Sequence, residues 1–129
     1  RPWPMAKQHY TIEDNGLAKP WAGRVWCNPP YGAETGTWLA RCAAHGDALS
    51  LIFARTETEH FFDHVWGRAS AVLFLRGRLN FYDVQGQRSK FNSGAPSCIV
   101  AYGAECLDRL RAAVESGALT GQLVRLGGA

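Results

Sequence analysis

Residues 25–32, with the sequence VWCNPPYG, are the most informative part of the chain. Three apolar residues at their start indicate a short buried strand that ends at Asn28. The two prolines that follow fix φ and remove backbone N–H donors, so the turn is stiff and rich in acceptors. Tyr31 adds a flat ring for stacking, and Gly32 lets the chain turn. This combination predicts a clamp for a planar amine; the alternative is an ordinary Pro-Pro turn in which Tyr31 only packs.

Length and composition predict one globular domain. The chain has 129 residues, of which 47% are hydrophobic and 19% charged, as in folded rather than disordered proteins. No apolar run approaches the roughly 20 residues of a membrane span, so we expect no membrane partner. A net charge of +3 permits a phosphate-rich partner without requiring one. The chain starts with Arg1 instead of Met, and we expect it to lack its natural N-terminal segment.

Cysteine and histidine spacing gives no metal-binding pattern. No two cysteines form a Cys-x-x-Cys pair, and we expect free, buried thiols in a reducing cytosol. They are Cys27, Cys42, Cys98 and Cys106. His60 and His64 stand one helical turn apart, but the glutamate of the zinc-protease pattern is missing between them. We therefore expect surface or packing histidines and no metal.

Apolar runs and amphipathic segments alternate along the chain. They predict strands at 10–12, 23–27, 48–53, 71–75, 98–102 and 122–126, and helices at 34–44, from Thr56 or Thr58 to Trp66, and 105–114. The order favours an α/β fold with a mostly parallel sheet and helices on both faces. Only a polar connection precedes 98–102, which predicts an antiparallel hairpin strand near the C-terminus. Asn28, Arg55 and 76–78 follow strand ends and should share one sheet edge.

Several segments together resemble the phage-type DNA N6-adenine methyltransferase family. They are 11–17 with Trp21, 26–32 with Trp38, 54–58 and 77–81, in the family's order. The resemblance covers about 10–102. It implies a Rossmann-like S-adenosylmethionine methyltransferase fold in one domain spanning 1–129. It also implies a site-specific, adenine-specific DNA methyltransferase.

By this resemblance, the clamp holds an adenine that has been flipped out of DNA. Asn28 and the carbonyl of Pro29 accept the two N6 hydrogens, Pro30 holds the turn, and Tyr31 stacks on the base. S-adenosylmethionine is the expected methyl donor, and DNA is the expected partner. Methyl transfer from a sulfonium depends mainly on positioning, so no strong base is required.

Further contacts are also implied by the resemblance. The expected substrate contacts are Tyr31, Arg55, Arg78, Phe81, Arg88 and Lys90. The alternatives are a surface ion pair for Arg55, core packing for Phe81, and plain solvation for Arg88 and Lys90.

Asp14 and Asn28 are the expected cofactor contacts. For Asp14 the alternative is a turn in which its side chain caps the backbone. The family's acidic or glycine-rich turn after the first strand is not found before Asp14.

Other functions use the same clamp chemistry. One is methylation of an RNA adenine or of a protein glutamine, since each presents a planar amine. Another is an inactive nucleic-acid-binding homologue that has kept the fold. For the favoured reading we expect the cytoplasm of a bacterium or of a phage-infected host, and protection of phage or prophage DNA as the role.

Overall fold

The computed structural model describes residues 8–10, 21, 23–29, 32–77, 80–82, 88–92 and 95–127, with the backbone alone for 8–10, 80–82 and 88–92. The strands are β1 (Gln8–Tyr10), β2 (Val25–Cys27), β3 (Ala48–Phe53), β4 (Ala71–Leu75), β5 (Asn80–Tyr82), β6 (Arg88–Asn92), β7 (Ser97–Tyr102) and β8 (Gly121–Arg125). The helices are α1 (Thr35–His45), α2 (Glu59–Phe61) with its π-helical continuation η2 (Phe62–Trp66), and α3 (Ala104–Glu115).

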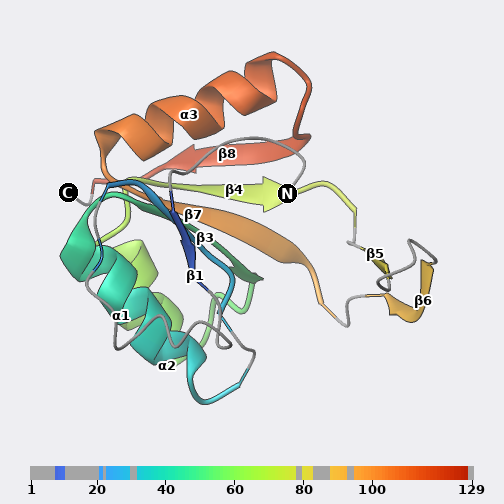
Figure 1. The fold of residues 1–129 in the computed structure, drawn as a ribbon, viewed down its shortest axis with the longest axis horizontal. Coiled ribbons are helices and arrows are strands. Elements are labelled where there is room, and N and C mark those ends of the chain that lie inside the picture. The colour runs from blue at the N-terminus through green and yellow to red at the C-terminus, as the bar shows by residue number, and fades with distance from the viewer. Residues whose placement is uncertain are drawn as a thin grey trace.

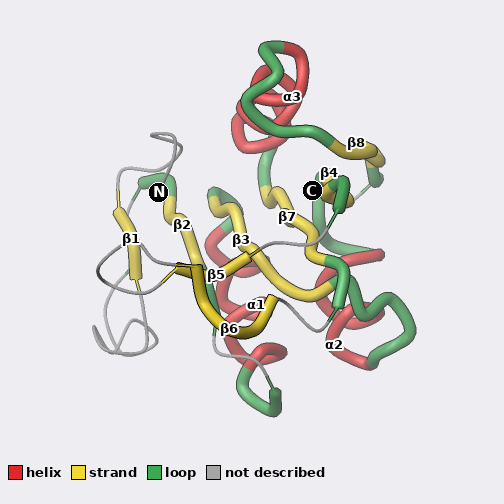
Figure 2. Tube along the Cα trace, turned by 90° about the vertical axis from the view of Figure 1, so that its right-hand side faces the viewer, coloured by secondary structure: helices red, strands yellow, loops and turns green. Residues whose placement is uncertain are grey.

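Within the described residues, six strands form one sheet in the order β1-β2-β3-β7-β4-β8, which Figure 2 shows from left to right. The first three strands pair in parallel. β7 lies between β3 and β4 and is antiparallel to both, and β8 is antiparallel to β4. β5 and β6 form a separate hairpin beyond the carboxyl end of β4 (Figure 1).

The prediction of a mostly parallel, Rossmann-like sheet is wrong. Of the five pairings between the described strands of this sheet, three are antiparallel. Segment 98–102 does return antiparallel to 71–75, but as β7 it lies inside the sheet, where one reversed strand creates two antiparallel pairs. All six residues of β7 are buried, which suits an interior position. β8 adds the third antiparallel pair at the edge.

Helices cover both faces of the sheet, with α3 on one side and α1 and α2 on the other (Figure 1). Each side has its own apolar core, and alternate strand residues enter one or the other. In β2, Val25 and Cys27 join the α1 core while Trp26 joins the α3 core. No helix in the described part of the chain is long and apolar enough to cross a membrane.

The helices on the α1 side agree only partly with the sequence pattern. The helix predicted at 34–44 is confirmed as α1, and it ends at Gly46, whose φ is 78° and whose N–H donates to the carbonyl of Cys42. The helix predicted to end at Trp66 is α-helical for three residues only and then widens into η2. The sequence pattern places the apolar residues of this segment, Phe62 among them, on its inner face; Phe61 and Val65 are buried there, but Phe62 is 61% exposed, so the prediction is wrong for Phe62.

All four cysteines are buried and free, as predicted. A hydrogen bond with Cys27 raises the pKa of Cys42. Burial raises the pKa of Cys98 and of Cys106 to about 12. The thiols of Cys42, Cys98 and Cys106 therefore stay protonated near neutral pH and pack as small apolar groups.

We predict that Gly103→Ala strongly destabilises the fold. Gly103 links β7 to α3 with a φ of +100°, and a Cβ there would collide with the carbonyl oxygen of Gly46. Strain and clash together should cost at least about 2 kcal/mol of unfolding free energy in urea denaturation. The control is Gly67→Ala, where a Cβ meets no atom within 4 Å. Equal stability of the two variants would contradict this reading of the β7–α3 junction.

We predict a smaller loss for Tyr102→Phe. The Tyr102 hydroxyl donates a hydrogen bond to the His64 carbonyl and so ties η2 to the sheet. Burial raises the pKa of Tyr102, which keeps the hydroxyl protonated as a donor. Removing a donor to a part-buried carbonyl costs about 1–3 kcal/mol. The control is Ser116→Ala, which removes an exposed hydrogen bond from a hydroxyl to a carbonyl. Equal melting temperatures for the two variants would contradict the prediction.

Candidate active site

The described part of the clamp lies at the carboxyl end of β2. This strand is buried on both faces and hydrogen-bonded between β1 and β3, so the chain leaves the sheet directly after it. Asn28 is exposed, whereas Pro29 is buried. Pro30 and Tyr31, the other two clamp residues, lie outside the described residues.

The clamp leads straight into α1. Gly32 has a φ of +107°, and its carbonyl accepts a hydrogen bond from the Thr35 N–H at 3.2 Å. That bond closes the turn in front of the helix. Trp38 and Leu39, both buried, then anchor α1 against the sheet. The end of β2 and the start of α1 therefore fix both ends of the clamp.

The ends of β2, β3 and β4 lie at one edge of the sheet. These strands run in the same direction, because β7 is antiparallel to both β3 and β4. Asn28, Arg55 and Arg76 follow the three ends, as the order of elements predicted. β2 and β3 are neighbours, but β7 separates β3 from β4, so β4 is three strand spacings, about 14 Å, from β2. The structure thus brings Arg55, and not Arg76, next to the clamp.

A cavity of about 210 Å³ lies between the end of β3, the start of α1 and α2. We call it the Arg55–His60 cavity; its lining residues are Gly32, Thr35, Phe53, Arg55, Thr58 and His60. The Arg55 guanidinium carbon lies 5.8 Å from the centre of the Phe53 ring. The Arg55 carbonyl accepts hydrogen bonds from the Thr58 hydroxyl at 2.7 Å and the Thr58 N–H at 3.2 Å. The backbone of Arg55 is therefore fixed while its charged end is exposed.

His60 and His64 lie one turn apart, in α2 and η2. Burial lowers the pKa of both; His64 also lowers that of His60, and Arg68 that of His64. Both imidazoles are therefore neutral at pH 7. Among the residues that the structure describes, no group of three or more histidine, cysteine or carboxylate side chains is placed to hold a metal.

The remaining candidate residues lie elsewhere or are not described. Phe81 lies in β5, and Arg88 and Lys90 in β6, in the hairpin beyond the carboxyl end of β4 (Figure 1). Asp14 and Arg78 lie outside the described residues.

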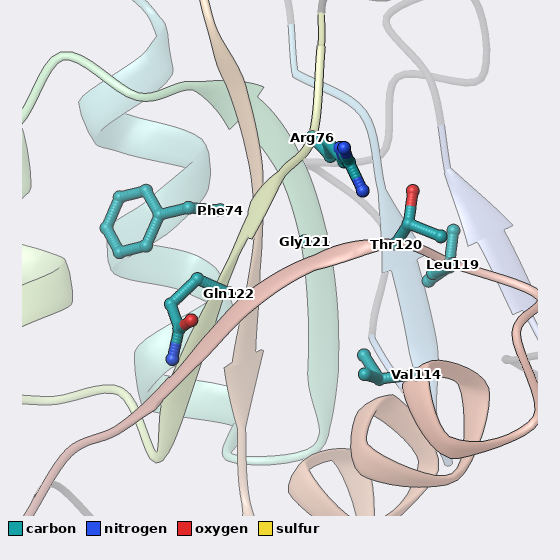
Figure 3. A pocket seen from close by; sticks show the side chains of 7 residues that line it. All are labelled: Phe74, Arg76, Val114, Leu119, Thr120, Gly121 and Gln122. Carbon is teal, nitrogen blue, oxygen red and sulfur yellow. The ribbon is translucent and has the colours of Figure 1, made fainter.

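A second cavity, of about 500 Å³, lies where β4, β8 and the end of α3 meet (Figure 3). Its lining residues are Phe74, Arg76, Val114, Leu119, Thr120, Gly121 and Gln122. Arg76 and Thr120 lie together there, since the Arg76 N–H donates to the Thr120 carbonyl at 2.9 Å. The cavity belongs to the β4–β8 end of the sheet, three strands from the clamp, and its size alone does not make it the reaction site.

Among the described residues, the linings of the Arg55–His60 cavity and of the β4–β8 cavity do not suit the positive groups of S-adenosylmethionine. A sulfonium and an ammonium group call for carboxylate or carbonyl acceptors. Neither of the two cavities at this edge has a carboxylate among its lining residues, and each contains an arginine. The acidic candidate, Asp14, is not among the described residues.

Sequence reasoning missed four residues of the Arg55–His60 cavity, namely Thr35, Phe53, Thr58 and His60. Thr35 and Thr58 lie at helix starts, where threonine usually serves as a cap. His60 was set aside because its spacing from His64 lacks the glutamate of the zinc-protease pattern. The sequence signal was Gly36, a glycine inside the helix predicted at 34–44. In the structure α1 and α2 meet at this glycine, where a Cβ would stand 3.2 Å from the His60 Cβ.

A scan against family models matches the chain to one family. The match is to the DNA N-6-adenine-methyltransferase (Dam) model over residues 4–118, which contain every described element except β8. Searches of curated proteins and of solved structures found no match. The family implies DNA as substrate and S-adenosylmethionine as methyl donor, as the sequence resemblance did. The chain therefore belongs to the DNA N-6-adenine-methyltransferase (Dam) family.

Proposed function

We propose that this protein methylates adenine N6 at specific sites in DNA, on a flipped-out base held by Asn28, Pro29, Pro30 and Tyr31. One observation carries the proposal: Asn28 is exposed at the end of a doubly buried strand, in a chain of a DNA adenine methyltransferase family. S-adenosylmethionine supplies the methyl group. The reaction belongs in the cytoplasm of a bacterium or a phage-infected host, where both substrates are present.

Asn28 and Pro29 act on the amine. The side-chain oxygen of Asn28 and the carbonyl of Pro29 accept the two N6 hydrogens. These two hydrogen bonds withdraw the N6 lone pair from the ring system and direct it toward the incoming methyl group. The exposed position of Asn28 supports this arrangement, because an exposed side chain at the end of β2 is accessible to a substrate. Positioning of this kind accounts for much of the barrier lowering in group transfer.

Tyr31 offsets the cost of removing the base from the duplex. Flipping costs a few kcal/mol in lost stacking and pairing. Stacking on an aromatic side chain recovers about 1–3 kcal/mol. Pro30 limits the conformations of the turn, which keeps the ring oriented toward the base.

Basic residues around the same edge bind the DNA backbone. Arg55 lies beside the clamp, and Arg88 and Lys90 belong to the hairpin beyond β4. Arg78 and Phe81 follow β4 and complete the proposed DNA contacts. On the cofactor side, Asp14 and Asn28 are the proposed contacts.

We predict that Asn28→Ala lowers kcat for methyl transfer by about 10²–10³-fold, the typical loss for one charge-stabilising hydrogen bond. Because Asn28 is exposed, the unfolding free energy should change by less than about 0.5 kcal/mol. Gln122→Ala removes an exposed amide from β8 and serves as the matched control, with unchanged activity expected. Steady-state assays with labelled methyl donor check both variants; full activity of Asn28→Ala would refute the clamp.

The substrate class is tested by offering the full-length protein DNA, RNA and a glutamine-containing protein with labelled S-adenosylmethionine. We expect label in adenine-containing DNA. Transfer to RNA or protein alone would replace DNA as the substrate. Absence of cofactor binding in calorimetry, with DNA binding retained, would identify an inactive binding homologue instead.

A further inference from the structure

We propose that the Arg55–His60 cavity binds a phosphate group of the DNA backbone beside the target adenine, with Arg55 and His60 as its two ligands. The inference rests on the proposed function, since it takes DNA as the substrate of the clamp. It gives His60 a substrate contact, in place of the surface or packing role expected from the sequence. Size, position, charge and hydrogen-bonding capacity of the cavity support it.

The cavity lies directly beside the clamp. Gly32, one of its lining residues, is the residue after Tyr31, and Phe53 ends β3, the neighbour of β2. Flipping rotates a nucleotide about its backbone, so its base enters the site and its flanking phosphates remain at the entrance. A base held by Asn28 and Tyr31 therefore brings its own phosphates close to this cavity.

The charge of the cavity suits an anion. No lining residue is a carboxylate, and among the described residues the Arg55 guanidinium has no salt-bridge partner. Its contact is with the face of the Phe53 ring, which leaves the N–H groups at its edge available. A guanidinium binds phosphate through paired N–H donors.

His60 contributes a neutral donor. Close packing of α2 on α1 at Gly36 holds its backbone in place. Burial lowers the pKa of His60, and the nearby His64 lowers it further because the two rings disfavour being protonated together; Glu57 opposes this effect. At pH 7 the ring therefore carries one N–H to donate and no net charge. Arg55 and His60 thus differ in what they offer: one supplies charge, the other a hydrogen bond.

The size of the cavity limits what it holds. Its volume of about 210 Å³ is below the roughly 300–1,000 Å³ of typical small-molecule sites. It is too small to be the site of a whole nucleotide with its base. A phosphate group with the edge of its sugar, which would rest on Phe53, is the part of DNA that suits it.

The salt dependence of DNA binding by the full-length protein distinguishes the contribution of Arg55 from that of His60. For Arg55→Gln we expect weaker binding and a slope of log K against log salt that is smaller by about one. For His60→Ala we expect about fivefold weaker binding at pH 7.5, the equivalent of one neutral hydrogen bond, with an unchanged slope. His60→Gln, which keeps an N–H donor, should recover most of the affinity. His64→Gln is the matched control and should bind like the wild type.

Ethylation of single phosphates locates the contact on the DNA. On a duplex whose methylated adenine has been mapped, we expect one phosphate flanking that adenine to interfere with wild-type binding when ethylated. The same phosphate should lose its interference in both Arg55→Gln and His60→Ala, and keep it in His64→Gln. Because both side chains hold one group, the double variant should lose less affinity than the product of the single losses.

Wild-type affinity in folded His60→Ala, or equal losses in His60→Ala and His64→Gln, would overturn this inference while adenine methylation by the wild type still stood. A protein that binds DNA with this dependence on Arg55 and His60 but transfers no methyl group would instead overturn the proposed function alone. Loss of interference at different phosphates in the two variants would show that the cavity does not hold a single group.

Discussion

Burial of β2 on both faces is the constraint on which the rest of the structure depends. Val25 and Cys27 are fully buried in the core under α1, and Trp26 is buried in the core under α3. Each such side chain contributes roughly 1.5–3 kcal/mol on burial. A shift of one residue would send Trp26 into the wrong core, and β1 and β3 hold the strand by hydrogen bonds on either side. The point at which the chain leaves the sheet, and with it Asn28, is fixed by this packing.

The same kind of burial explains why the sheet is mixed. β7 is buried along its whole length and occupies the middle of the sheet, between β3 and β4. Its apolar run predicted a strand, and the polar connection before it predicted an antiparallel return. Neither signal says between which strands the segment inserts, since that depends on long-range competition for the core. The elements were thus predictable from local pattern, whereas the order of strands was not.

The candidate site shows the same division. Asn28 and Arg55 could be placed at one edge from the sequence, because each follows a run of apolar residues that had to be a strand. Arg76 shares that edge, but β7 separates it from the clamp, which no local signal showed. The packing of α2 on α1 at Gly36 places His60 at the cavity, and Phe62, at the start of η2, is exposed to solvent. These features arise from contacts between elements, which the periodicity within one element does not reveal.

In the proposed account, the end of β2 holds the adenine amine and the neighbouring end of β3 contacts the DNA backbone, in a chain of the DNA N-6-adenine-methyltransferase (Dam) family. The most direct measurement is mass spectrometry of nucleosides from DNA that has been incubated with the protein and isotopically labelled S-adenosylmethionine. We expect the label in N6-methyldeoxyadenosine, at the nitrogen that Asn28 and Pro29 are proposed to hold. Label in methylated cytosine, or unlabelled nucleosides from a protein that binds the methyl donor, would contradict the assignment.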